Sequence, residues 1–128
     1  MKPDFSGEWI LDRQASTLSP AAAAFDSGVM RIDHREPVFA FQIKMVAGGK
    51  SVEHAGEGRV SDGREVAGEG IVTSLCWDGD ALVFTFREPQ WTMSFRYELL
   101  EKGRRLRAVE QLRGAGRDQD NVWVYDRR

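Results

Sequence analysis

The sequence predicts an all-β protein: a single closed up-and-down antiparallel β-barrel of about 8–10 strands, with one short helix after the first strand. Apolar and polar residues alternate with a period of two along most of the chain, as in half-buried strands. Glycine- and aspartate-rich turns separate the alternating segments, as in a series of hairpins. Residues 5–11 and 122–127 both have strand patterns, so the first and last strands can pair and close the barrel.

The first half of the chain contains four alternating segments and the only predicted helix. The strands are expected within residues 5–11, 30–34, 39–45 and 52–60. Ser19 can cap a helix whose first turn contains Pro20 and whose body is the alanine run 21–24. Val52, His54 and Val60 are expected on one face of the fourth strand.

The second half is predicted to continue the same series of hairpins. A fifth strand is expected from Val66 to Trp77, with Gly68 and Gly70 marking a bend or bulge. The later strands are expected at residues 82–86, 91–99, 106–112 and 122–127. Because no linker or repeat interrupts the 128 residues, we expect one domain spanning residues 1–128.

Composition narrows the classes of function. The net charge of -2 and the mixing of acidic with basic residues argue against nucleic acid as a partner. No stretch approaches the roughly 20 apolar residues of a membrane span, so no membrane partner is expected. The lone Cys76 excludes an internal disulfide and is compatible with a reducing compartment. We expect a cytoplasmic monomer or homodimer, although a chain trimmed of a leader peptide would look the same.

Short motifs at both ends resemble the calycins, the superfamily of lipocalins and intracellular fatty-acid-binding proteins. They are Gly7-x-Trp9 on the first strand and Tyr125-Asp126-Arg127 on the last. The likeness to fatty-acid-binding proteins extends through residues 61–66 and 77–83, and the whole chain also resembles uncharacterised lipocalin-like proteins of bacteria. This resemblance implies that Trp9 plugs the narrow end of the barrel beneath Arg127, as a structural pair.

The chain departs from the fatty-acid-binding pattern in two ways. Residues 12–28 leave room for one short helix instead of the helix pair of that family. The family's Arg-x-Tyr on the closing strand is replaced, since Trp123 stands in the arginine position while Tyr125 is retained. Arg96 is expected to face solvent. A neutral or aromatic ligand is therefore favoured over a fatty acid.

Side-chain alternation predicts a strongly aromatic interior. The residues expected to bind a ligand there are Phe39, Phe41, Ile43, Phe84, Phe86, Trp91, Phe95 and Tyr97, with Trp123 and Tyr125 as polar handles. The alternative is that these bulky side chains simply fill the barrel.

The two histidines are the weak catalytic candidates. His34 and His54 both share a face with apolar neighbours, and an interior histidine can act as a general acid or base. Two histidines without a third ligand make a poor metal site, so neither a metal nor another cofactor is expected. The leading hypothesis is a barrel that binds a small hydrophobic or aromatic molecule without transforming it. The alternatives are an enzyme using one of these histidines, or a filled barrel with a structural or interaction role.

Overall fold

The computed structural model describes residues 2–116 and 118–128, with side chains for all of these except Glu57. Within this part the chain forms ten strands and two single-turn 3-10 helices. The elements are β1 (Gly7–Leu11), η1 (Ala22–Ala24), β2 (Ser27–Arg35), β3 (Val38–Ala47), β4 (Lys50–Val60), β5 (Val66–Gly68), β6 (Ile71–Asp78), β7 (Ala81–Glu88), β8 (Trp91–Leu100), η2 (Glu101–Gly103), β9 (Arg105–Gly114) and β10 (Gln119–Arg127).

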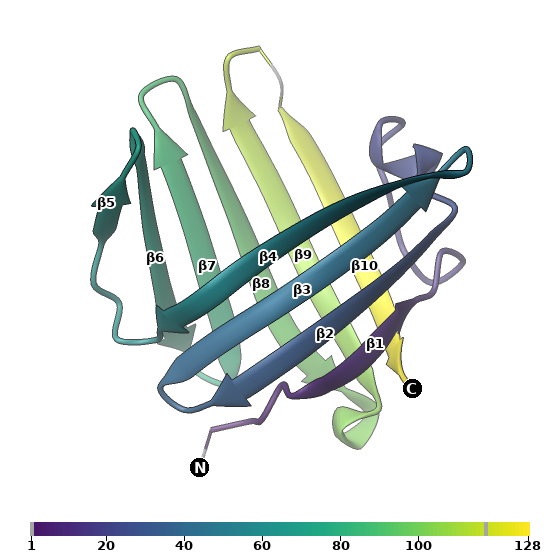
Figure 1. The fold of residues 1–128 in the computed structure, drawn as a ribbon, viewed down its shortest axis with the longest axis horizontal. Coiled ribbons are helices and arrows are strands. Elements are labelled where there is room, and N and C mark those ends of the chain that lie inside the picture. The colour runs from purple at the N-terminus through teal and green to yellow at the C-terminus, as the bar shows by residue number, and fades with distance from the viewer. Residues whose placement is uncertain (1, 117) are drawn as a thin grey trace.

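All ten strands belong to one antiparallel sheet, in the order β4-β3-β2-β1-β10-β9-β8-β7-β6-β5. The first and last strands pair, with Trp9 opposite Arg127. Figure 1 shows β2, β3 and β4 crossing in front of β7 to β10, so the curled sheet forms two layers that enclose an interior. The predicted all-β antiparallel barrel, with one short helix after the first strand, is confirmed.

The edges of the sheet, β4 and β5, are adjacent in the chain and are joined by residues 61–65. The two margins meet through a few hydrogen bonds between this region and β6. The N–H of Gly63 donates to the carbonyl of Leu75 at 2.9 Å, and Arg59 Nη1 donates to Thr73 Oγ1 at 3.4 Å. These contacts tie the end of β4 to the opposite layer.

The prediction of a single strand from Val66 to Trp77 is wrong, because the structure divides this segment into β5 and β6. The two strands pair as a hairpin, with Val66 opposite Thr73. The turn between them consists of Glu69 and Gly70, whose φ angles are 53° and 80°. Two successive positive φ angles are typical of the tight hairpin turn that matches the twist of a sheet.

A β-bulge in β4 shifts the alternation of side chains, so that different residues face the interior on either side of it. On β3, Phe41 pairs with Gly56 and Phe39 pairs with Arg59. Two residues of β3 are thus matched by three residues of β4, which is one extra residue in β4. Val60 is therefore 45% exposed. The expectation that Val60 shares the face of Val52 is wrong, because the extra residue turns Arg59 inward in its place.

The segment between β1 and β2 covers one side of the barrel opening. Its helix is the single turn η1, in which the Ala22 N–H donates to Ser19 Oγ at 3.4 Å. Thr17 forms a β-bridge with Val122, which fixes this segment against β10. As a result Ala22 is buried, and Phe25 packs against the core. Within the described residues no helix is long and apolar enough to cross a membrane.

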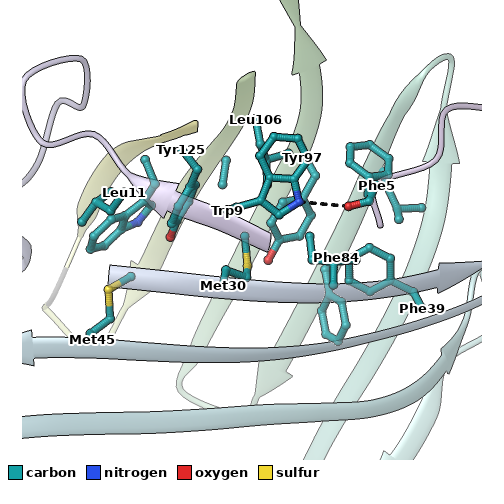
Figure 2. Close-up of a cluster of buried hydrophobic side chains, with 14 of the residues drawn as sticks. Phe5, Trp9, Leu11, Met30, Phe39, Met45, Phe84, Tyr97, Leu106 and Tyr125 are labelled. Carbon is teal, nitrogen blue, oxygen red and sulfur yellow. Dashed lines mark hydrogen bonds between the residues drawn. The ribbon is translucent and has the colours of Figure 1, made fainter. Parts of the chain in front are cut away.

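One end of the barrel is closed by packed aromatic side chains. We call this set the floor cluster: Phe5, Trp9, His34, Phe39 and Trp77. Trp9 is fully buried, and its indole N–H donates to the carbonyl of Phe5 at 3.0 Å (Figure 2).

The structure places the Arg127 guanidinium 4.2 Å from the centre of the Trp9 ring. Gly7 is required beside this pair. Its φ is 142°, and a Cβ there would lie 2.4 Å from Arg127 Nη1. The Gly7-x-Trp9 motif thus supplies both the indole and the space for the arginine that covers it.

Candidate functional site: an aromatic cavity between the two layers

A cavity of about 420 Å³ lies between the two layers of the barrel. The strands β2, β3 and β4 contribute one side of the lining, and β7 to β10 contribute the other. The interior is therefore not completely filled by side chains. The lining residues are Phe25, Met30, Phe41, Ile43, Met45, Val52, His54, Ala55, Gly56, Arg59, Phe84, Phe86, Met93, Phe95, Tyr97, Ala108, Glu110, Trp123 and Tyr125.

The main wall of the cavity consists of aromatic rings packed on one another. Phe84 and Phe86 stack with their centres 4.5 Å apart, and Phe95 and Tyr97 stack at 6.0 Å. Phe86 meets Phe95 edge to face at 6.4 Å, which joins the two stacks into one surface. Because each ring is held by its neighbours, this wall is an ordered apolar surface.

The opposite side of the cavity depends on a glycine. Phe41 packs edge to face against Phe84, 6.4 Å between ring centres. A Cβ at Gly56 would lie 2.2 Å from the Phe41 ring, so only glycine lets that ring lie against the backbone of β4.

Most of the residues expected to line the interior do line this cavity. They are Phe41, Ile43, Phe84, Phe86, Phe95, Tyr97, Trp123 and Tyr125.

Two residues expected in the lining lie elsewhere. Phe39 faces inward but belongs to the floor cluster, with its ring centre 5.5 Å from that of His34. Trp91 begins β8 and borders a separate hollow at the rim, next to Gly114. That hollow adjoins the cavity through Met93, which lines both. Alternation predicts the face of a strand correctly, but not the depth of a residue along the barrel axis.

A carboxylate that the sequence interpretation missed projects into the cavity. Glu110 on β9 accepts hydrogen bonds through Oε1 from Asn121 Nδ2 and Trp123 Nε1, both at 2.9 Å. The indole handle of Trp123 is therefore satisfied by this side chain. A signal was present in the sequence, because Glu110 interrupts the inward face formed by Ala108 and Leu112.

Two tyrosine hydroxyls lie near that carboxylate. Burial raises the pKa of Tyr97, and the negative charge of Glu110 raises it further. Burial likewise raises the pKa of Tyr125, with smaller contributions from Tyr97 and Glu110. Both phenols point toward the side of the barrel that carries Met30 (Figure 2). They therefore remain protonated at neutral pH and can donate hydrogen bonds.

An arginine is the second charged group of the lining that the sequence interpretation missed. Arg59 follows the bulge in β4, and the centre of its guanidinium lies 5.9 Å from the centre of the Phe84 ring. Its Nη1 donates to the neutral hydroxyl of Thr73, while its buried Nε has no partner among the described residues. The preference for a neutral ligand assumed an interior without a cation, and Arg59 removes that basis.

His34 is buried in the floor cluster and does not line the cavity. The N–H of Phe5 donates to His34 Nδ1 at 3.2 Å, so the ring hydrogen sits on Nε2, which donates to Glu36 Oε2 at 2.9 Å. The other carboxylate oxygen, Oε1, accepts from Trp77 Nε1 at 3.1 Å and from the Ser61 hydroxyl. This arrangement joins the N-terminal segment, the β2–β3 turn and the end of β4, so His34 has a structural setting.

The three hydrogen bonds that Glu36 accepts stabilise its ionised form. Burial alone would raise the pKa of the carboxyl group, but the hydrogen bonds from Ser61, His34 and Trp77 outweigh it and lower the pKa.

His54 lies on the rim of the cavity. It is exposed on the edge strand β4, beside the exposed lining residues Val52 and Ala55. The cavity therefore reaches the surface along this strand. Among the described residues no group of three or more histidine, cysteine, aspartate or glutamate side chains could hold a metal ion.

Comparison with known proteins identifies the fold. No family model matches the chain, and no curated protein matches its sequence. Solved structures do match over nearly the whole length. A secretory abundant heat soluble (SAHS) protein from Ramazzottius varieornatus has a TM-score of 0.65 at 12% identity, with 96% of this chain and 94% of the other covered.

Two further matches carry ligands in their descriptions. Zebrafish ileal bile acid-binding protein complexed with cholic acid has a TM-score of 0.61 at 14% identity, covering 97% of this chain and 98% of that one. Schistosoma mansoni fatty acid binding protein in complex with arachidonic acid has a TM-score of 0.59 at 12% identity, covering 97% and 96%. The chain therefore has the calycin-like fold of fatty-acid-binding proteins.

Proposed function

We propose that this protein binds a small, largely hydrophobic molecule in the cavity between its two layers and does not transform it. The observation that carries the proposal is the cavity itself, about 420 Å³ in volume and walled by stacked phenylalanine and tyrosine rings. Ligand sites in proteins are typically concave, mostly apolar and supplied with a few polar groups that orient the ligand. This cavity has that composition.

The structural relatives support the proposal at the level of the fold. Two proteins with the same architecture were solved with cholic acid and with arachidonic acid, both small amphipathic molecules. The sequence identity of 12–14% carries no ligand over to this chain. The class of ligand is therefore argued from the lining residues.

The proposal favours a carrier over an enzyme because neither histidine is placed for catalysis. His34 is occupied by Phe5 and Glu36 and lies outside the cavity. His54 stands exposed at the rim, where bulk water has access to its ring, so it lacks the water-excluded surroundings of a catalytic site. The lone Cys76 is compatible with a cytoplasmic location, which we retain as part of the proposal together with a monomer or homodimer.

A pair of valine variants tests whether binding occurs in the cavity. Val52 lines the mouth and is 43% exposed, whereas Val60 on the same strand is 45% exposed and lies outside the lining. Val52→Trp places an indole in the mouth, and Val60→Trp places the same indole on the surface. The probe is anilinonaphthalene, an uncharged dye whose fluorescence rises in apolar surroundings.

We expect saturable binding of anilinonaphthalene to the wild-type protein, at least tenfold weaker binding to Val52→Trp, and unchanged binding to Val60→Trp. Absence of saturable binding to the wild type would refute the proposal. Equal weakening in both variants would refute the cavity as the binding site.

A further inference from the structure

Glu110 is a carboxylate in the lining of the aromatic cavity that has no cationic partner among the described residues. It is half-buried on β9, and its hydrogen bonds come from two neutral groups, Asn121 Nδ2 and Trp123 Nε1. Both of these donors bind the same oxygen, Oε1, at 2.9 Å. The other oxygen, Oε2, accepts no hydrogen bond from the described residues and is not sealed off from the open space beside it. A partly desolvated carboxylate with a free oxygen is a strong acceptor for a positively charged donor.

Carboxylates outside the cavity show what this group obtains elsewhere in the described chain. Glu98 pairs with Arg107 and Glu65 pairs with Arg87, each at 3.1 Å. None of the ion pairs between described residues involves Glu110, whose partners are the neutral groups on β10. Glu110 is therefore the carboxylate for which a bound molecule would supply the missing positive charge.

Two phenol hydroxyls provide further acceptors on the same side of the cavity. Tyr97 on β8 and Tyr125 on β10 both line it. Neither hydroxyl has a hydrogen-bond partner among the described residues, and neither is sealed off, so both face open space. Burial raises the pKa of both phenols, and the charge of Glu110 contributes to both shifts. The three groups therefore lie within electrostatic reach of one another.

We infer that the cavity binds a hydrophobic amine in its protonated form, and that the free oxygen of Glu110 on β9 binds the ammonium group. The inference rests on the proposed function and specifies its ligand class. An ammonium group has three N–H donors and no acceptor, so it needs the kind of surroundings that the carboxylate and the two phenol oxygens provide. The aromatic lining favours the same charge, because the face of a ring attracts a cation within about 6 Å of its centre.

Arg59 determines the direction in which the ligand lies. It belongs to β4 in the other layer, where the centre of its guanidinium lies 5.9 Å from the centre of the Phe84 ring. Its positive charge repels an ammonium group from that side of the cavity, whereas the negative charge of Glu110 attracts it to β9. The apolar remainder of the ligand then lies along the stacked rings of Phe84 and Phe86.

Three ligands with one aromatic body test this inference. Naphthylmethylamine carries an ammonium group at neutral pH, naphthylmethanol is uncharged, and naphthylacetate carries a carboxylate. Calorimetric titration at pH 7 gives the affinity of the protein for each of them. Because the naphthalene ring is the same in all three, differences between the affinities report on the charged or polar end.

The test variant is Glu110→Gln, which removes the charge but keeps an oxygen that can accept from Asn121 and Trp123. Glu98→Gln is the matched control. Its carboxylate is also partly buried, with 28% of the side chain exposed, but Glu98 lies outside the cavity lining. Both variants change the net charge of the protein by the same amount, so a difference between them comes from the position of the carboxylate.

In the wild-type protein we expect naphthylmethylamine to bind most tightly and naphthylacetate most weakly. Glu110→Gln should weaken the binding of naphthylmethylamine by roughly 10- to 100-fold and leave that of naphthylmethanol within about threefold. The same variant should strengthen the binding of naphthylacetate, because the repulsion by Glu110 is removed. Glu98→Gln should leave the ratio of the amine and alcohol affinities unchanged. This ratio within each variant does not depend on the fraction of protein that folds.

The outcomes separate this inference from the proposed function. If naphthylmethanol binds and Glu110→Gln leaves the ratio unchanged, the cavity is a binding site but the role of Glu110 is refuted. If naphthylacetate binds the wild-type protein more tightly than naphthylmethylamine, the ligand class is refuted. If Glu98→Gln lowers the ratio as much as Glu110→Gln does, the effect comes from overall charge and the inference again fails. If none of the three binds the wild-type protein, the proposed function and this inference fall together.

Discussion

The floor cluster and the cavity of the barrel are built from the same kinds of side chain but differ in how closely these side chains pack. At the floor cluster, aromatic rings pack against one another outside the cavity, and the indole and imidazole N–H groups there are paired. Trp9 donates to Phe5, and His34 binds both Phe5 and Glu36. In the cavity, rings of the same type pack on one another but leave about 420 Å³ between them, and Arg59 Nε has no partner among the described residues.

This difference separates the part of the interior that stabilises the fold from the part that we propose binds a ligand. Close packing and paired polar groups make the floor cluster favourable in the folded protein without any ligand. The cavity forgoes part of that packing, and its apolar lining gains contacts when a molecule of matching shape enters. Truncations at the floor should therefore reduce the free energy of unfolding most, whereas changes to side chains at the mouth of the cavity should mainly alter binding.

The largest effect is expected for Trp9→Ala in the floor cluster. Trp9 is fully buried, so its removal leaves a large void and should lower the free energy of unfolding by about 3–5 kcal/mol. Trp91→Ala is the matched control, because this tryptophan is half-buried at the rim and should cost less than about 2 kcal/mol. Urea unfolding followed by circular dichroism measures both. Equal losses would contradict the assignment of stability to the floor.

Gly56→Ala tests the wall of the cavity. The added Cβ would lie 2.2 Å from the Phe41 ring, and displacing that ring should cost about 1–3 kcal/mol of stability. Gly68→Ala is the control, since a Cβ there has no neighbour within 4 Å among the described atoms, and the change should be within about 0.5 kcal/mol. Thermal unfolding of the two variants gives the comparison. Equal stability of the two variants would show that the Phe41 ring moves aside without cost.

Arg127→Met tests how much the arginine that covers Trp9 contributes to the stability of the floor cluster. The guanidinium lies over Trp9 and also donates to the carbonyls of Ser6 and Gly103 at 2.7 and 2.9 Å. We expect a loss of about 1 kcal/mol from the cation–π contact, together with altered tryptophan fluorescence. Arg31→Met, which removes an exposed ion pair with Glu8, should change the stability by less than about 0.5 kcal/mol. A spectrum unaffected by Arg127→Met would indicate that the stacked geometry is not maintained.

The smallest effect is expected for Glu36→Gln, and it should depend on pH. The pKa of Glu36 is lowered from 4.5 in the folded state, so its ionised form contributes stability above pH 4.5. This contribution is lost as the pH falls through the lower folded pKa. Since 41% of the side chain is exposed, water screens it, and the loss in the variant should stay below about 1 kcal/mol at pH 7.

Urea midpoints of the wild type and Glu36→Gln, measured from pH 7 to about pH 3, should converge at the acid end. A difference that stayed constant over this range would show that the charge of Glu36 does not contribute.

Much of the fold could be predicted from the sequence because a strand places alternate side chains on opposite faces. The alternation through Phe84 and Phe86 placed both rings in the interior correctly, and the glycine and aspartate turns gave most of the hairpins. The sequence predicted one strand where the structure has the pair β5 and β6. The turn between them places Glu69 at a φ of 53°, a conformation that a glutamate does not predict. The split into β5 and β6 therefore came from the structure.

The charged part of the site is where prediction from the sequence failed. Arg59 faces the cavity because a bulge adds one residue to β4, and a local pattern of apolar residues contains no sign of that shift. Glu110 could have been noticed, since it stands on the inward face of its strand between Ala108 and Leu112. A carboxylate is expected to face water unless a partner is known, and the partners of Glu110, Asn121 and Trp123, lie on another strand.

The sequence by itself determined that the chain forms an antiparallel barrel with an aromatic interior, because alternation and turn chemistry act between near neighbours along the chain. Only the tertiary structure decided how far along the axis each ring lies, which rings close the floor and which surround open space. It also decided that Arg59 and Glu110 face the same cavity from opposite layers. Depth, bulges and partners on distant strands depend on how the sheet curls, and that curvature is set by all the strands together.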